Sequence, residues 1–132
     1  MWFNKVSYFL IIVMLFIACS SREEKAIKSQ YVLNNKEYVG KWKVWGTNPD
    51  RSDWHEFYII LYDDGSAEDT WESGEKGAWV MSGDKAVIMW NNGWKEIIRK
   101  TSDGKYEKLG YGPKVLFNEP PTNTSDAIKV SN

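Results

Sequence analysis

Cysteine and histidine are almost absent from this chain, which has 132 residues but only one of each, Cys19 and His55. A lone cysteine cannot form a disulfide within the chain, and one histidine with no second cysteine cannot complete a zinc site. The glycine-flanked serine of a hydrolase nucleophile turn and the glycine-rich loop that binds phosphates are also missing. The sequence therefore predicts no metal, no cofactor and no catalytic residue, and we expect a protein that is not an enzyme.

Basic charge is scarce as well. The chain carries 17 Lys and Arg against 18 Asp and Glu, a formal net charge of −1 at pH 7. Proteins that bind nucleic acid carry a basic face or stripe that neutralises the phosphates. Because the chain has no such excess, we do not expect nucleic acid as a partner.

Only one stretch of the chain is apolar for long. Residues 6–17 follow the positive Lys5 and end at the small residue Ala18, just before Cys19. A membrane-spanning helix needs about 20 apolar residues, so this stretch is too short to span. A positively charged N-terminal region, a short apolar run and a small residue before the cleavage site are typical of a secretory signal peptide. We therefore expect residues 1–18 to be a signal peptide that is removed on export.

The end of this segment, Leu15-Phe16-Ile17-Ala18-Cys19, resembles the bacterial lipobox. In lipoproteins with this motif the cysteine becomes the mature N-terminus and carries lipid, palmitate included. The resemblance implies that lipid on Cys19 anchors the mature chain to a membrane, and several acyl chains make such an attachment effectively permanent. Ser20 is similar to the signal for outer-membrane sorting, which implies a cell-envelope protein on the periplasmic face or on the cell surface.

The rest of the chain divides into a polar stretch and a domain. Residues 19–36 are of mixed charge and almost free of large apolar side chains before Tyr31, so we interpret them as the lipidated N-terminus and a flexible tether. In residues 37–132 apolar runs alternate with turn dipeptides at a spacing of about ten residues, which is typical of a β meander. The turn signals are Asp64-Gly65, Ser73-Gly74, Ser82-Gly83, Asn92-Gly93 and Asp103-Gly104.

We expect this domain to be all-β, a small antiparallel meander barrel of seven to eight strands. A closed or nearly closed barrel is favoured because an open meander leaves two edges that can pair with other chains. The expected strands are Tyr38–Gly46, His55–Tyr62, Ser66–Glu72, Gly77–Met81, Ala86–Trp90, Trp94–Lys100 and Lys105–Tyr111. A last short strand uses either Lys114–Phe117 or Ala127–Val130, and no helix signature follows the signal peptide.

Near the start of the domain, Val39-Gly40-Lys41-Trp42 resembles the Gly-x-Trp signature of the lipocalin and calycin barrels, and the pattern recurs at Gly77-Ala78-Trp79. In that family the glycine–tryptophan pair closes one barrel end, and the interior holds a small, usually apolar ligand. The resemblance covers about residues 38–111 and implies a lipocalin-like domain. A barrel of about eight short strands has an interior that side chains can fill or that can hold one small ligand.

Large aromatic side chains are abundant, since seven of the eight tryptophans lie after the signal peptide. Strand alternation makes both faces of several strands apolar, whereas a packed interior needs only one. The side chains assigned to the core are Trp42, Phe57, Ile59, Leu61, Trp79, Ile88 and Ile98. Aromatic rings with a polar tip suit a boundary between dry and wet surroundings. The candidates for a ligand-binding face or barrel mouth are Trp45, Trp54, Tyr58, Tyr62 and Trp94.

Carboxylates are the remaining candidates for catalytic groups. Two of them at a suitable separation could hydrolyse a glycosidic bond, but aspartate near a turn commonly caps the local backbone instead. The acidic groups near turns are Asp63-Asp64, Glu68-Asp69 and Asp50 with Asp53. Asp69 stands out because alternation turns it inward, where a carboxylate needs a partner such as Arg99 or Lys43.

Together these features predict a membrane-anchored, non-catalytic lipoprotein that recognises a small amphipathic molecule or a glycan through exposed aromatic side chains. The alternative is a protein-binding envelope module, for example an inhibitor of an exported hydrolase. A ligand-binding barrel should show a pocket with an aromatic side chain at its mouth. A protein-binding module should instead present a flat apolar patch on the outer faces of its strands.

Overall fold

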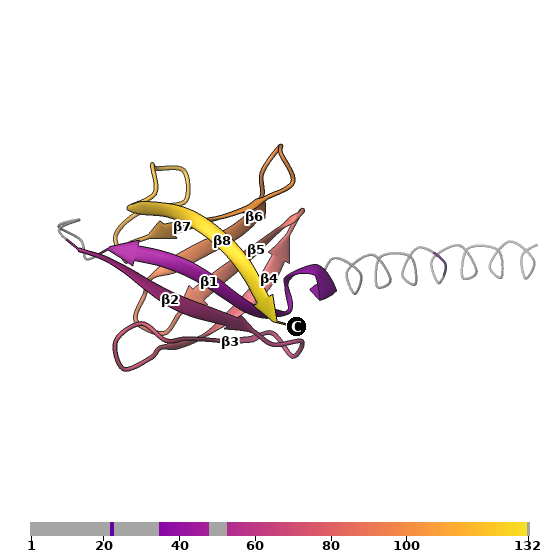
Figure 1. Cartoon of the computed structure of the whole chain (residues 1–132), viewed down its shortest axis with the longest axis horizontal. Coiled ribbons are helices and arrows are strands. Elements are labelled where there is room, and N and C mark those ends of the chain that lie inside the picture. Colours follow the sequence, from indigo (N-terminus) through magenta and orange to yellow (C-terminus); the bar gives the residue numbers. More distant parts are fainter. Residues whose placement is uncertain (1–21, 23–34, 48–52, 132) are drawn as a thin grey trace, which may run out of the picture. The chain divides into compact units, whose positions relative to one another are not determined.

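The computed structural model describes residues 22, 35–47 and 53–131. In this part of the chain eight strands form one closed barrel in which each strand pairs antiparallel with the next and the last pairs with the first (Figure 1). The strands are β1 (Gly40–Thr47), β2 (Trp54–Leu61), β3 (Ser66–Asp69), β4 (Lys76–Ser82), β5 (Lys85–Trp90), β6 (Lys95–Lys100), β7 (Tyr106–Tyr111) and β8 (Asn123–Ser131). The prediction of an all-β antiparallel meander barrel is confirmed.

Among the first seven predicted strands, two boundaries were wrong by two residues or more, each for a local reason. Tyr38 belongs to a helical turn over residues 35–38 and not to the first strand, because the backbone N–H of Val39 bonds back to the carbonyl of Asn35 over 3.1 Å. The third strand ends at Asp69 rather than at Glu72, since a turn begins there. Of the two alternatives for the last strand, the one at 127–130 is contained in β8, while 114–117 lies in the loop before it.

The predicted signal peptide and Cys19 lie outside the described residues. Among the residues that the structure does describe, no helix is long and apolar enough to cross a membrane. The chain from Asn34 to Asn132 forms a compact unit of its own.

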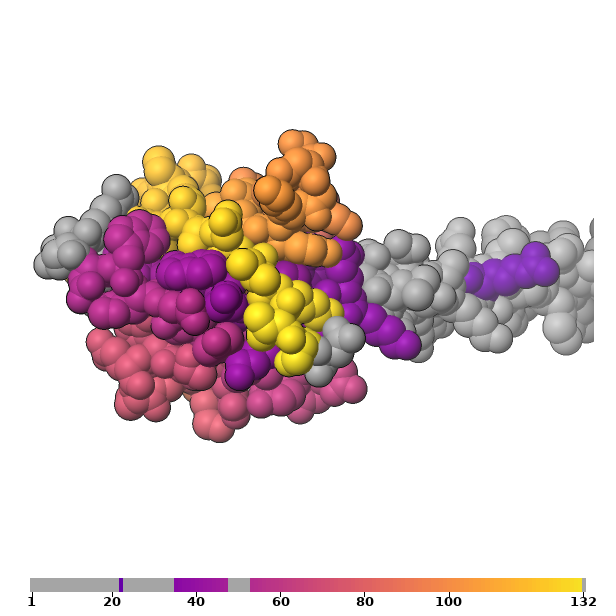
Figure 2. Space-filling view, viewed as in Figure 1, coloured from indigo at the N-terminus to yellow at the C-terminus, as the bar shows by residue number. Residues whose placement is uncertain are grey.

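Strand alternation fills the barrel interior with large side chains. All seven predicted core residues are buried, and Trp42, Ile59, Ile88 and Ile98 are fully so. The seam between β1 and β8 is closed by backbone pairing, and Figure 2 shows the side chains of these two strands packed against each other on one face of the barrel. The alternation read from the sequence therefore identified the interior correctly.

One end of the barrel is sealed by aromatic rings. The indole N–H of Trp42 donates to the carbonyl of Tyr38 over 2.8 Å, and the Tyr38 hydroxyl donates to the carbonyl of Asp84 over 2.6 Å. Tyr106 packs edge-on against the Trp42 ring at 4.9 Å between ring centres. Gly40, with φ of 131°, starts β1 in a conformation that other residues rarely adopt. We call this the closed end, and it is also where the chain enters the barrel.

Some of the apolar and aromatic side chains on the outer faces of the strands are covered by a loop of the same chain. Ile97, Leu109 and Tyr111 point outward from β6 and β7 and are buried together under the loop of residues 112–122. Tyr111 meets Phe117 of that loop edge-on at 5.1 Å between ring centres. A second apolar face therefore exists, as the sequence indicated, but here the chain covers it itself.

Candidate functional site

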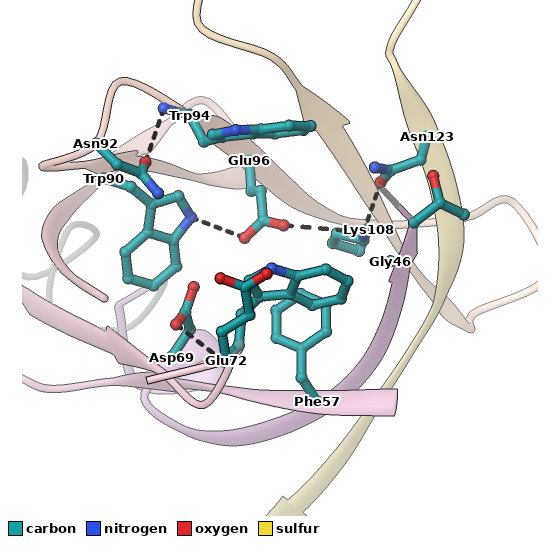
Figure 3. Close-up of a pocket in the computed structure, with 12 residues that line it drawn as sticks. Gly46, Phe57, Asp69, Glu72, Trp90, Asn92, Trp94, Glu96, Lys108 and Asn123 are labelled. Atoms are coloured by element: carbon teal, nitrogen blue, oxygen red, sulfur yellow. Dashed lines mark hydrogen bonds and ion pairs between the residues drawn. The ribbon is translucent and has the colours of Figure 1, made fainter. Parts of the chain in front are cut away.

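The end of the barrel opposite the closed end contains a cavity of about 280 Å³ (Figure 3). The lining comes from the end of β1, from β2, from the end of β3 and the loop after it, from the end of β5 and the β5–β6 turn, from the start of β6, from the middle of β7 and from the start of β8. The lining residues are Gly46, Thr47, Phe57, Asp69, Trp71, Glu72, Trp90, Asn92, Trp94, Glu96, Lys108 and Asn123. Because these segments are far apart in sequence but meet at one barrel end, the closed meander itself builds the site. We call it the open-end cavity.

The floor of the open-end cavity is a buried polar network. Lys108 Nζ lies 3.8 Å from a carboxylate oxygen of Glu96, and the two side chains are 1% and 8% exposed. Lys108 also donates to the side-chain oxygen of Asn123 over 2.7 Å, and the indole N–H of Trp90 donates to Glu96 over 2.9 Å. Burial raises the pKa of Glu96 and lowers that of Lys108, while each charge opposes the shift of the other.

A glycine makes room for this network. Gly110 of β7 pairs with Asn123 of β8, and a side-chain carbon at Gly110 would lie 2.5 Å from the Asn123 oxygen that accepts from Lys108. Any larger residue would push Asn123 away from Lys108. The polar floor therefore depends on a residue that has no side chain of its own.

Asp69 faces the open-end cavity from the end of β3. One of its carboxylate oxygens accepts the backbone N–H groups of Trp71 at 3.1 Å and Glu75 at 2.9 Å, which fixes the β3–β4 loop. Burial raises the pKa of Asp69 from its ordinary 3.8 to about 6, and repulsion from Glu96 and Glu75 adds to the shift, while the two N–H bonds oppose it. The predicted partners, Arg99 and Lys43, were wrong: Arg99 pairs with Glu107 at 2.7 Å, and the bonds to Asp69 come from the backbone.

Asp69→Asn is expected to stabilise the fold above pH 6. The folded-state pKa lies above the unfolded one, so the stability linked to this group is full below about pH 4 and is lost as the pH rises through about 6. The asparagine keeps the oxygen that accepts both N–H groups but carries no charge. Two pKa units correspond to about 3 kcal/mol, and because the side chain is partly exposed to solvent the expected gain is reduced to about 1–1.5 kcal/mol at pH 8.

Urea unfolding followed by tryptophan fluorescence at pH 4 and pH 8 checks this prediction. The gain from Asp69→Asn should be near zero at pH 4 and largest at pH 8. Glu68→Gln, next to it on the outer face of β3, is the matched control and should give no gain. An equal gain at both pH values would show that ionisation of Asp69 does not oppose folding.

Two further features mark the rim of the open-end cavity. The hydroxyl oxygen of Thr47 is buried and has no hydrogen-bond partner among the described residues. Glu72 has a φ of 50°, in the left-handed region, and it is the one residue other than glycine with a positive φ in the described part of the chain. Strained backbone of this kind costs about 1–3 kcal/mol and collects at ligand sites.

The structure separates the five predicted binding aromatics. Trp94 lines the open-end cavity. Trp54 is 54% exposed beside Pro121 in a different shallow hollow. Trp45 and Tyr58 lie on the outer barrel face, where the ammonium groups of Lys43 and Lys41 lie 5.7 and 4.4 Å from their ring centres. Tyr62 lies next to the β2–β3 turn and donates to Glu68 over 3.3 Å.

The other aromatic and polar lining residues were not assigned to a site from the sequence. Trp71, Trp90, Glu96 and Lys108 contribute more of the open-end cavity than the five candidates do. A usable signal was present, since alternation back from the core residue Ile98 places Glu96 on the inner face of β6. An acidic and a basic residue on the inner faces of adjacent strands require each other.

Of the remaining polar candidates, Asp50 lies outside the described residues, and His55 and Asp64 serve local structure. His55 Nε2 lies 2.8 Å from Asp53, and both side chains are more than half exposed. Asp64 accepts the backbone N–H of Ser66 over 2.9 Å and caps the β2–β3 turn. Among the described residues, no group of three or more His, Cys, Asp or Glu side chains could hold a metal ion.

Comparison of the chain with protein-family models, with curated proteins and with solved structures found no match to any of them. The function must therefore be inferred from the geometry and chemistry of the open-end cavity itself.

Proposed function

We propose that this chain is an envelope lipoprotein whose barrel binds a small amphipathic molecule or a glycan in the open-end cavity. One observation carries the proposal: a cavity of about 280 Å³ with aromatic walls lies over a buried polar floor. Small-molecule sites typically combine apolar walls with a few placed polar groups in this way. The cavity is at the small end for such sites, which restricts the ligand to a small molecule or to one sugar-sized part of a larger one.

The buried polar floor supports binding over a purely structural role. A buried ion pair such as Glu96 with Lys108 contributes little to stability compared with apolar side chains of similar volume. The rest of the interior, from Ile98 toward the closed end, is apolar or aromatic and well sealed. Polar groups concentrated at one end of an otherwise apolar barrel are therefore best explained by a ligand that uses them.

The end of the barrel at which the preceding chain joins also fits this role. The helical turn of residues 35–38 joins β1 at the closed end, so the chain that leads to Cys19 is attached at the end opposite the cavity. Residues 35–38 are accordingly absent from the lining of the cavity.

The exposed apolar side chains are divided among separate parts of the barrel: Val80 and Met89 on β4 and β5, Leu116 and Phe117 in the loop before β8, and Ile128 and Val130 on β8. Because β4 and β5 are not neighbours of β8, these side chains do not form one continuous flat patch, which gives the protein-binding alternative less support.

Fluorescence titration of the segment Ser20–Asn132, which contains every strand of the closed barrel, tests the proposal. The probes are benzyltrimethylammonium, benzyl alcohol and methyl glucoside, which are small enough for the cavity. Trp94→Ala should weaken binding of any bound probe by at least about tenfold, or about 1.4 kcal/mol. Trp54→Ala, the same substitution at an exposed site outside the cavity, should leave affinity unchanged. Equal losses in both variants, or no binding of any probe, would contradict the proposal.

The lipoprotein assignment predicts a separate result for Cys19→Ser. The wild-type chain, expressed in a bacterium with labelled palmitate, should be labelled and should sediment with membranes. The variant has no thiol to acylate and should lose the label and appear in the soluble fraction, because a single chain of lipid or none gives only marginal binding. Full labelling of the variant would show that lipid is attached elsewhere or that the label is not specific.

A further inference from the structure

The side chains that line the open-end cavity include more acidic than basic groups. Asp69, Glu72 and Glu96 are acidic, and Lys108 is the basic residue among them. Lys108 is paired with Glu96, so these two charges offset each other. Asp69 and Glu72 form no ion pair with any of the described residues. Two acidic groups therefore lie at the cavity without a cation, Asp69 partly buried inside it and Glu72 exposed at its mouth. For Asp69 this arrangement is unfavourable when the cavity is empty.

The carboxyl groups of Asp69, Glu72 and Glu96 turn toward the middle of the cavity (Figure 3). Glu72 reaches this position from a backbone with φ of 50°, a conformation that costs free energy in any residue with a side chain. A glycine at this position would avoid the strain. The fold thus holds a carboxylate at the mouth of the cavity at some cost to its own stability.

Aromatic faces complete the surroundings of these carboxylates. Figure 3 shows the flat face of the Trp94 ring turned toward the cavity, across from Phe57. Trp71 packs edge-on against Phe57 at 5.1 Å between ring centres and adds to the opposite wall. The face of an indole ring is electron-rich and attracts a cation, by about 0.5–2 kcal/mol depending on how far water is excluded.

We propose that the open-end cavity binds a small organic cation of the alkylammonium class, with its charge beside Asp69 and Glu72 and its alkyl groups against Trp94. The proposal rests on the proposed function, because it names the ligand class of the same cavity. The volume of about 280 Å³ is that of about nine water molecules at about 30 Å³ each, enough for an ammonium centre with a few carbons. The buried Thr47 hydroxyl supplies a hydrogen-bond partner for a polar tail.

Alternative ligand classes fit the same lining less well. An anion would meet an excess of carboxylates, with the amine of Lys108 already bonded to Asn123 and paired with Glu96. A neutral sugar could stack on Trp94 but would leave the charges of Asp69 and Glu72 uncompensated.

The experiment compares two probes of the same shape that differ only in charge. Choline carries a trimethylammonium group, and 3,3-dimethylbutan-1-ol replaces its nitrogen by carbon. Calorimetric titration of the segment Ser20–Asn132 at pH 7.5 should show choline binding at least about tenfold more tightly than the neutral alcohol. Methyl glucoside is titrated alongside as the neutral glycan probe.

Two variants of adjacent residues locate the effect. Asp69→Asn removes the charge inside the cavity and keeps the oxygen that fixes the β3–β4 loop, so choline affinity should fall by about tenfold. Glu68→Gln removes the same charge from the outer face of β3, where Glu68 pairs with Lys76, and should change choline affinity less than about twofold. Glu72→Gln should weaken choline binding in the same direction as Asp69→Asn.

The outcomes separate this inference from the proposed function. Choline and the neutral alcohol binding equally, or methyl glucoside binding more tightly than choline, would overturn the cation inference while a ligand site remained. Equal losses in Asp69→Asn and Glu68→Gln would also overturn it, because net charge and not the cavity would then be responsible. If no probe bound the wild-type segment, both the inference and the proposed function would fail.

Discussion

Lys108→Met is expected to lower the free energy of unfolding by about 3–5 kcal/mol at pH 8. The substitution preserves the apolar stem but leaves Glu96 buried, with the Trp90 N–H as its remaining bond partner among the described residues. Loss of the ammonium group raises the pKa of Glu96 further, because the charge of Lys108 had opposed the effect of burial. In the variant, a buried Glu96 destabilises the fold when it is ionised and not when it is protonated. The loss in free energy of unfolding relative to the wild type should therefore grow as the pH rises from 5 to 8.

The double variant Glu96→Gln with Lys108→Met is the control for this prediction. Glutamine carries no charge and can still accept the indole N–H of Trp90. Most of the lost stability should return, since removing both members of a buried pair is often neutral. Guanidinium unfolding of the wild type, the single variant and the double variant at both pH values gives the comparison. A double variant as unstable as the single one would show that packing of the lysine stem, and not its charge, supports the barrel.

Trp42→Ala is expected to have a similar effect at the closed end, with a loss of about 3–5 kcal/mol. Trp42 is fully buried against Tyr38 and Tyr106, and its N–H satisfies the carbonyl of Tyr38. A loss of this size is a large part of the stability of a small domain, about 5–15 kcal/mol. Trp42→Phe keeps most of the ring, loses the hydrogen bond and should cost about 1–3 kcal/mol, which remains measurable.

Trp54→Ala provides the contrast for Trp42. Trp54 is more than half exposed, so its removal should change the free energy of unfolding by less than about 0.5 kcal/mol. Thermal unfolding followed by circular dichroism ranks the three variants. If Trp42→Ala were as stable as Trp54→Ala, the closed end would not be the stabilising part of the barrel.

The fold could be predicted because its signals are local. Apolar side chains alternate along β2 and β5, and glycines with positive φ, such as Gly65 and Gly93, stand at the turns between strands. Each of these features needs only a few neighbouring residues to be recognised. Glu72 is the exception, since a glutamate in a left-handed conformation cannot be recognised from its residue type.

The site could be predicted only in part because it depends on which strand ends meet. Trp71 and Trp94 are separated by more than twenty residues and line the same cavity only because the end of β3 and the start of β6 lie at the same end of the barrel. Alternation alone also cannot tell an outer aromatic ring that binds a ligand from one that faces a lysine ammonium group of its own chain, as Trp45 faces that of Lys43. Asp69 was recognised as inward-facing because Ala67 and Trp71, which share its face by strand alternation, are apolar.

The most direct test of the open-end cavity as the binding site is a map of indole N–H signals by ¹⁵N NMR. Benzyltrimethylammonium is titrated into the labelled segment Ser20–Asn132. The indole of Trp90 bonds to Glu96 in the cavity floor, whereas those of Trp42 and Trp79 bond to the carbonyls of Tyr38 and Tyr62. The signals of Trp90 and Trp94 should shift together and saturate, with Trp42 and Trp79 unchanged. Signals of Trp90 and Trp94 that stay in place throughout the titration would contradict a binding site in this cavity.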